Sequence, residues 1–131
     1  MKKYIFLFFP LLIIDLTTKY LIINKEIAIN KYFLLNYSQN TGIAFSLLNN
    51  QNFLLITLSM IIIIILINFF IKEKKYQLGI TFILAGATGN LINRLQYGYV
   101  IDFIQIWIWP IFNLADIFNI IGIILILKKS S

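Results

Sequence analysis

Two aspartates stand in strongly apolar surroundings in the C-terminal third of the chain. Asp102 lies in the sequence VIDFI and Asp116 in NLADIF. A charged carboxylate among apolar residues costs several kcal/mol unless its pKa rises. Two such groups brought together share a proton, so one takes a proton from water while the other polarises a carbonyl or protonates a leaving group. We therefore predict that Asp102 and Asp116 are the catalytic pair of an aspartyl hydrolase; the alternative is that they join helices or act as counter-ions.

Two further spacings suggest partners for these groups. Asn113 stands one helical turn before Asp116, so its amide is placed either to orient that carboxylate or to cap the following helix. Asp15 and Lys19 have the i, i+4 spacing of a helical ion pair. A serine–lysine dyad of Ser46 and Lys19 is a rival catalytic arrangement, but nothing around Ser46 indicates a strained nucleophile. We expect a structural ion pair.

Other amides and one arginine accompany the aspartates. Asn90, Asn93 and Arg94 have the i, i+3 and i+4 spacing that places side chains on one helix face. Arg94 and Asn40 are candidates for holding a backbone carbonyl or a phospholipid-like group. The alternatives are a surface or headgroup contact for Arg94 and a turn beside Gly42 for Asn40.

The chain is too apolar for a soluble domain. Its 131 residues are 60% hydrophobic with a mean hydropathy of +0.89, whereas soluble domains are roughly 45–50% apolar. Most basic residues fall in three groups at the ends of apolar runs: Lys2 and Lys3; Lys72, Lys74 and Lys75; Lys128 and Lys129. We therefore expect an integral membrane protein whose lysines set its topology, with no nucleic-acid partner.

The residue types that are missing narrow the chemistry further. The chain has no cysteine and no histidine. This excludes cysteine nucleophiles, serine–histidine triads, disulfides and the usual zinc ligands. Catalysis must come from carboxylates, hydroxyls, amides or lysines, and no metal or organic cofactor is implied.

The lysine groups and apolar runs predict an all-α membrane protein of four transmembrane helices with a small extracytoplasmic β element. We expect one domain over 1–131, with spans that cover roughly 4–23, 53–71, 78–95 and 112–127. Outer loops cover 24–52 and 96–111, and the first of them contains the patterns of a small sheet or hairpin. Both termini then lie in the cytoplasm. Glycines and alanines of the third span provide a surface for close helix approach.

Helical rise places the polar groups in one layer. At about 1.5 Å per residue, Asp15 lies roughly 18 Å beyond Lys3, and Asp116 lies roughly 18 Å beyond Lys128. Arg94 lies about 28 Å from the lysines that precede its helix. We therefore expect the site in the outer half of the membrane.

Four motifs in this chain resemble those of the lipoprotein signal peptidase family, also called signal peptidase II. They are DLTTK at 15–19, NTGIAFS at 40–46, GATGNLINRLQYGYVIDF at 86–103 and FNLADIFNIIG at 112–122. The resemblance implies a bacterial cytoplasmic-membrane enzyme that cuts signal peptides from prolipoproteins just before a diacylglyceryl-modified cysteine, at the outer face. It implies catalysis by Asp102 and Asp116. By the same motif match, the residues around the site are Asp15, Asn40, Asn90, Arg94 and Asn113.

One departure from the family pattern is visible. The family motif usually reads G-N-x-x-D-R, and here Asn93 stands where the aspartate is expected. Because both catalytic aspartates remain, we expect activity to survive.

The expected partners are the diacylglyceryl-prolipoprotein substrate and membrane phospholipid, and we expect a monomer. A small carboxylate-based transporter or proton-conducting protein is the rival class, although no internal repeat supports it. A membrane scaffold with structural ion pairs is a third possibility.

Overall fold

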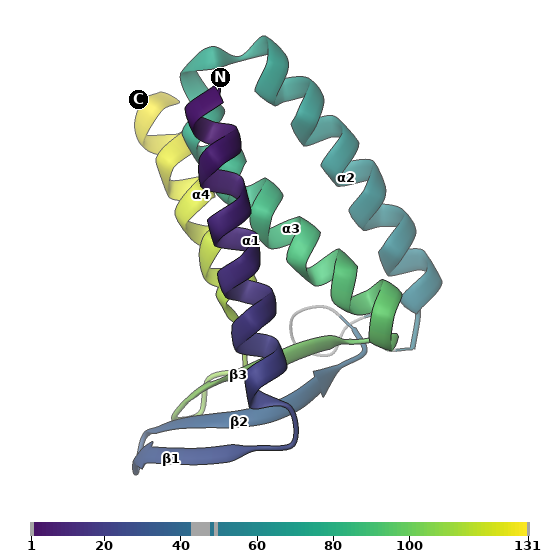
Figure 1. Cartoon of the computed structure of the whole chain (residues 1–131), viewed down its shortest axis with the longest axis vertical. Coiled ribbons are helices and arrows are strands. Elements are labelled where there is room, and N and C mark those ends of the chain that lie inside the picture. The colour runs from purple at the N-terminus through teal and green to yellow at the C-terminus, as the bar shows by residue number, and fades with distance from the viewer. Residues whose placement is uncertain (1, 43–47, 49, 131) are drawn as a thin grey trace.

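The computed structural model describes residues 2–42, 48 and 50–130. In chain order these residues form α1 (Lys2–Ile22), β1 (Glu26–Asn30), β2 (Phe33–Asn40), α2 (Asn52–Lys72), the 3-10 helix η2 (Lys74–Tyr76), α3 (Gln77–Tyr97), β3 (Val100–Ile106) and α4 (Leu114–Ser130). Figure 1 shows the α-helices running beside one another, with the strands at one end and both termini at the other. The chain is therefore mostly helical with a small sheet, as predicted. Ser46, the rival nucleophile, lies outside the described residues.

Helices α1 and α2 carry the strongest membrane signal. By length and composition, these are the helices of the described chain that could cross a membrane, with mean hydropathies of 1.9 for α1 and 3.0 for α2. Leu55 is the buried residue of α2, whereas large side chains such as Ile64 are mostly exposed. A helix that is apolar on all sides and unburied by protein is suited to lipid. The predicted first and second spans thus match α1 and α2 to within one or two residues.

The predicted third and fourth spans correspond to α3 and α4, with shifted ends. Helix α3 runs to Tyr97, two residues past the predicted end, and stops at Gly98, whose φ of +83° is left-handed. The Gly98 N–H there donates to the carbonyl of Arg94, an arrangement that satisfies a free helix carbonyl. Helix α4 begins at Leu114 rather than 112 and continues to Ser130.

Small residues let α3 and α4 approach closely. A Cβ atom added to Gly79 would lie 2.6 Å from the carbonyl oxygen of Gly122, and one added to Gly122 would lie 2.5 Å from that of Gly79. Both distances are far below van der Waals contact, so neither position has room for a side chain. The predicted small-residue surface on the third helix is confirmed, and α4 is the helix that packs against it.

The three strands form an antiparallel sheet in the order β1-β2-β3. Strands β1 and β2 are the hairpin predicted within 24–52. Strand β3 lies in 96–111, which was predicted as loop, so that prediction was wrong in part. Pairing of Ser38 with Asp102 and of Asn40 with Val100 makes this segment a strand, and local sequence does not show such a partner.

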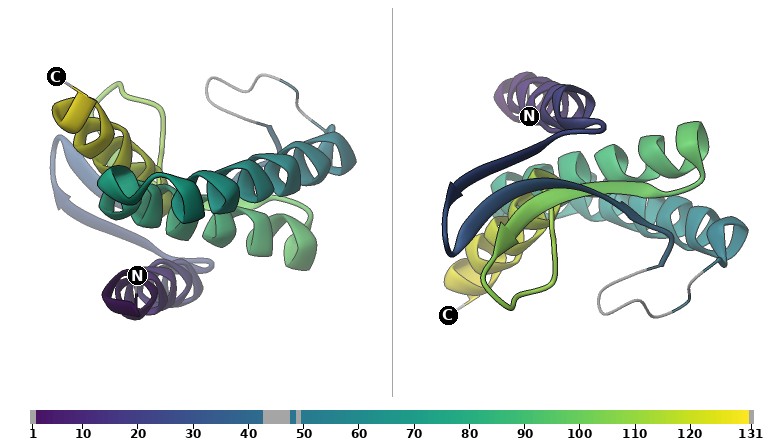
Figure 2. Two further views of the ribbon diagram at one scale, coloured as in Figure 1. Left: turned by 90° about the horizontal axis from the view of Figure 1, so that it is seen from above. Right: turned by 90° about the horizontal axis from the view of Figure 1, so that it is seen from below.

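A small core holds the sheet against the helices. Ile101, Phe103 and Ile104 of β3 are buried together with Ile22, the last residue of α1. Figure 2, viewed from below, shows the strands lying across the ends of the helices. This core fixes β3, and with it Asp102, beside the sheet-bearing ends of α1, α3 and α4.

Candidate active site

Asp102 is buried in β3 between two side-chain amides. It is 3% exposed. The Nδ2 atom of Asn113 donates to Oδ1 over 2.6 Å, and Nδ2 of Asn40 donates to Oδ2 over 2.8 Å. Asn40 also accepts the N–H of Gly42 through Oδ1, so the expected turn role is confirmed alongside its contact with the carboxylate.

Asp116 lies in the first turn of α4, where it forms a reciprocal cap with Asn113. The Asp116 N–H donates to Asn113 Oδ1 over 3.0 Å, while the Asn113 N–H donates to Asp116 Oδ2 over 3.1 Å. This is the geometry of a capping box, with aspartate in the place usually held by Glu or Gln. The helix N-terminus also favours the negative charge of the carboxylate. Nδ2 of Asn90 completes the site by donating to Asp116 Oδ1 over 3.2 Å.

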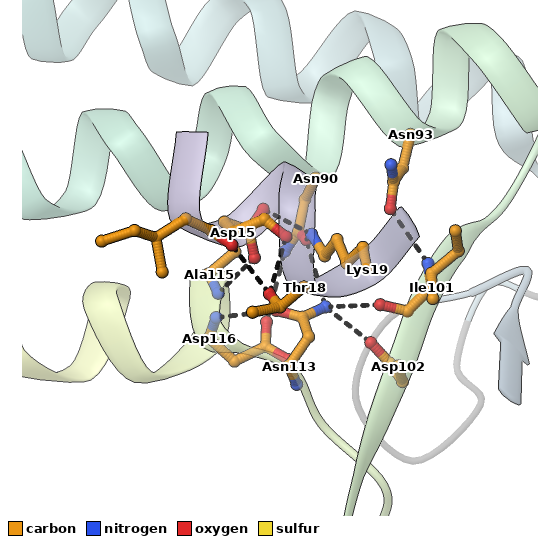
Figure 3. A network of polar contacts seen from close by, with 11 residues as sticks. Asp15, Thr18, Lys19, Asn90, Asn93, Ile101, Asp102, Asn113, Ala115 and Asp116 are labelled. Carbon is orange, nitrogen blue, oxygen red and sulfur yellow. Dashed lines mark hydrogen bonds and ion pairs between the residues drawn. The ribbon is translucent and has the colours of Figure 1, made fainter. Parts of the chain in front are cut away.

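Asn113 therefore joins the two aspartates (Figure 3). We predicted that its amide either orients Asp116 or caps the helix. The capping role is confirmed. The cap is made by the side-chain Oδ1 atom, whereas the side-chain Nδ2 atom donates to Asp102. The group of Asn113 that donates to the Asp116 carboxylate is its backbone N–H.

Asp15 and Lys19 support the site from α1. Their ion pair measures 2.8 Å and is completely buried, as the i, i+4 spacing predicted. Asp15 Oδ1 accepts the N–H of Ala115 over 2.9 Å, so α1 caps a free donor of α4. Lys19 Nζ also donates to Asn90 Oδ1 over 2.8 Å. Lys19 was not among the residues predicted to support the site; its spacing from Asp15 was the available signal.

Asn93 and Arg94 fix the backbone on either side of the site. Asn93 Oδ1 accepts the N–H of Ile101, the residue before Asp102. Arg94 is 8% exposed, and its Nη2 atom donates to the carbonyl of Gly42 over 2.7 Å. Of the two interpretations of Arg94, the alternative of a surface or headgroup contact is therefore wrong: the side chain is buried and anchors Gly42, which follows β2. Asn93, in turn, fixes the start of β3 through its hydrogen bond with the Ile101 N–H.

The surroundings of Asp102 raise the pKa of its carboxyl group. Burial raises its pKa from 3.8 to about 6, and the charge of Asp116 adds to the rise. The hydrogen bonds from Asn40 and Asn113 act in the opposite direction because they stabilise the charged form. Within the described residues, no group of three or more carboxylates, histidines or cysteines is placed to hold a metal ion.

Replacing Asn40 by alanine is expected to shift the pH dependence of the site. The variant loses a bond that stabilises ionised Asp102, so the pKa of Asp102 rises and its proton is kept to higher pH. Any activity that requires this proton should then persist about one pH unit further into the alkaline range. The measurement is kcat/KM against pH. Asn36→Ala is the matched control, because Asn36 makes an amide contact from β2 to Gln105 of β3; an equal shift in the control would contradict the prediction.

Replacing Gly89 by alanine is expected to displace Asp15. An added Cβ would overlap Asp15 Oδ2, and overpacking of this kind costs about 1–3 kcal/mol. We expect a lower unfolding temperature and reduced activity. The double variant Gly89→Ala/Asp15→Ala has room for the methyl group, so its loss should be smaller than the sum of the single losses. Strictly additive losses would show that the two positions act independently.

Comparison with known proteins identifies relatives along almost the whole chain. A family model described as Signal peptidase (SPase) II matches residues 7–130. Proteins named lipoprotein signal peptidase from Buchnera aphidicola subsp. Schizaphis graminum and from Moorella thermoacetica are 40% and 39% identical. The first alignment covers 97% of this chain and 92% of the relative, and the second covers 92% and 89%. A solved bacterial membrane enzyme superposes with a TM-score of 0.91 at 32% identity, over 100% of this chain and 91% of that one.

Proposed function

Because the chain belongs to the signal peptidase II family, whose members are aspartic peptidases, we propose that Asp102 and Asp116 are its catalytic residues. The observation that carries the assignment is Asn113, which contacts both carboxylates through two different N–H groups. The chain is an aspartic endopeptidase that removes signal peptides from prolipoproteins. Asp15, Asn40, Asn90, Arg94 and Asn113 are the residues that position the site.

The two aspartates act on water and on the peptide bond in turn. The ionised carboxylate takes a proton from water as the oxygen attacks the carbonyl carbon, and the protonated one donates a hydrogen bond to the carbonyl oxygen. The tetrahedral intermediate then collapses: the C–N bond breaks and a carboxyl proton passes to the leaving amine. The raised pKa of Asp102 supports its carrying the shared proton at the start.

The substrate we propose is a prolipoprotein with a diacylglyceryl-modified cysteine, cut just before that residue. Such a cysteine is anchored in the outer leaflet by its acyl chains, so its peptide bond lies near the membrane surface. The aspartates lie at the sheet-bearing end of the helices, opposite both termini. This placement supports a site at the outer face of the cytoplasmic membrane.

We also propose four spans with both termini in the cytoplasm. The three lysine groups stand at the start of α1, at the α2–η2 junction and at the end of α4. These ends of the helices lie together (Figure 1), which agrees with the excess of basic residues in cytoplasmic segments. We further propose that the protein is a monomer surrounded by phospholipid.

The direct test is cleavage of a diacylglyceryl-modified prolipoprotein by the purified full chain, with the same protein lacking the lipid as the control substrate. We expect cleavage before the lipidated cysteine, located by mass spectrometry of the product, and little cleavage of the control. Equal cleavage of both substrates would contradict recognition of the lipid. No cleavage of either would contradict the proposed function.

A further inference from the structure

The free end of the sheet exposes three large apolar side chains in a row. Trp107 is 66% exposed, Ile108 80% and Trp109 65%, and they follow directly after β3. The Trp107 N–H donates over 2.7 Å to the carbonyl of Tyr32, an exposed residue of the turn between β1 and β2. We name Lys31, Tyr32 and residues 106–110 the sheet tip. Figure 1 shows this end of the sheet opposite the end at which α1 leads into β1.

Hydrogen bonds hold the loop of the sheet tip in one shape. Ile104 and Phe112 exchange backbone hydrogen bonds at its base, and the Trp109 N–H donates to the Ile106 carbonyl over 2.9 Å. Trp107 has a φ of +49°, in the left-handed region that bulky residues rarely adopt. The fold therefore keeps an exposed tryptophan where asparagine or glycine would be less strained. Strain of this kind points to a function of the side chain, and an exposed ring can serve only a contact outside the protein.

The helices carry an apolar surface up to the level of the sheet. At their sheet-bearing ends, Tyr20 of α1, Phe53 of α2 and Leu95 of α3 are all exposed. In a membrane protein such side chains lie against lipid, with aromatic residues enriched where the hydrocarbon meets the headgroups. The strands lie across these same ends (Figure 2). The sheet tip is therefore at the depth of the headgroups.

The residue types of the sheet tip suit a phospholipid surface. Tryptophan and tyrosine each join an apolar ring to a polar N–H or O–H group, which matches a layer that is apolar on one side and wet on the other. Lys31 is exposed, and its Nζ atom lies 5.6 Å from the ring centroid of Tyr32. Residues 30–33 and 105–111 contain no aspartate or glutamate, so no carboxylate of these segments repels a lipid phosphate.

We infer that the sheet tip inserts into the headgroup layer of the leaflet around the sheet-bearing helix ends, with both indole rings at the boundary of the acyl chains. A second copy of the chain is a poorer occupant. Two buried tryptophans supply roughly 300–500 Å², whereas a standard protein interface buries about 800 Å² on each partner. The catalytic pair is also remote, because Trp107 lies about 16 Å beyond Asp102 along an extended strand.

This contact sets the depth of the site, because the loop of the sheet tip joins β3, which carries Asp102, to the start of α4. By the proposed topology the leaflet is the outer one, and the inference rests on the proposed function in that respect alone. It does not depend on the assignment of Asp102 and Asp116.

Tryptophan fluorescence tests the inference, because Trp107 and Trp109 are the two tryptophans of the chain. The full chain is reconstituted in vesicles of dioleoylphosphatidylglycerol and dioleoylphosphatidylethanolamine that contain lipids brominated either near the headgroup or near the methyl end of the chains. We expect strong loss of fluorescence with the shallow bromine, weak loss with the deep bromine and little quenching by acrylamide in the water. The single-tryptophan variants Trp107→Phe and Trp109→Phe should both show this order.

The matched control moves the reporter into the hydrocarbon. Trp107→Phe/Trp109→Phe/Ile64→Trp has one tryptophan, near the middle of α2, at a position that is 65% exposed like Trp109. Deep bromine should quench this variant more strongly than shallow bromine. Asp102→Asn should be quenched like the wild type, so failure of the catalytic assignment would leave the result intact.

Four outcomes would overturn the inference. Strong quenching by acrylamide without quenching by either brominated lipid would place the sheet tip in water. Protection from acrylamide that grows with the protein-to-lipid ratio would show contact with a second copy. Protection that appears only after prolipoprotein is added would make the sheet tip a substrate site. Stronger quenching of the wild type by deep bromine would place its rings in the hydrocarbon core.

Discussion

Replacing Asp102 or Asp116 by asparagine is expected to lower kcat by about 10²–10⁴-fold, because each variant removes one partner of the proton exchange. Residues that act as a unit have non-additive effects. The double variant should therefore be little worse than either single variant. The measurement is cleavage of the diacylglyceryl-modified prolipoprotein under single-turnover conditions.

Folding must be separated from chemistry in these variants. Both oxygens of Asp102 accept hydrogen bonds from N–H groups. An asparagine at this position would place its NH₂ group against one of these donors, and the lost hydrogen bond would lower the stability of the fold. Unfolding temperature should be measured beside activity for each variant. Glu26→Gln is the charge-matched control, because Glu26 is an exposed carboxylate on β1. Wild-type cleavage by folded Asp102→Asn and Asp116→Asn proteins would show that the carboxylates are structural.

Replacing Asn113 by alanine is expected to reduce both stability and activity. The variant loses the side-chain cap on Asp116, worth about 1 kcal/mol, and the bond that fixes Asp102. A small displacement of a catalytic group can cost about 10²-fold in rate, so we expect a loss of that order in kcat. Steady-state cleavage and thermal unfolding measure the two effects.

Asn113→Ser separates the two roles. Serine caps a helix about as well as asparagine, but its hydroxyl is too short to reach Asp102. We expect an unfolding temperature near that of the wild type together with the low kcat of the alanine variant. If the serine variant regains wild-type activity, Asn113 acts through the helix cap alone and its contact with Asp102 has no catalytic value.

Local spacing determined the features that lie within one helix or at its end. Apolar composition and lysine position indicated a membrane protein, and the i, i+4 spacing of Asp15 and Lys19 gave their ion pair. The i, i+3 spacing of Asn113 and Asp116 led to two interpretations, and one of them was the helix cap. These contacts are visible in the sequence because helical geometry alone brings such residues together.

Contacts between distant segments were decided by the tertiary structure. Strand β3 exists because β2 pairs with it, and this pairing places Asn40 against Asp102, 62 positions away. Packing of α1 against α3 sets Lys19 on Asn90, 71 positions away.

The same limit explains why the sequence left two interpretations of Arg94 open. Its position near the end of α3 allowed a contact at the membrane surface, yet its side chain is buried and donates to the Gly42 carbonyl. Periodicity within one segment reports which side of a helix is polar. It does not report which other segment packs there, because that depends on the register and crossing of elements far apart in the chain.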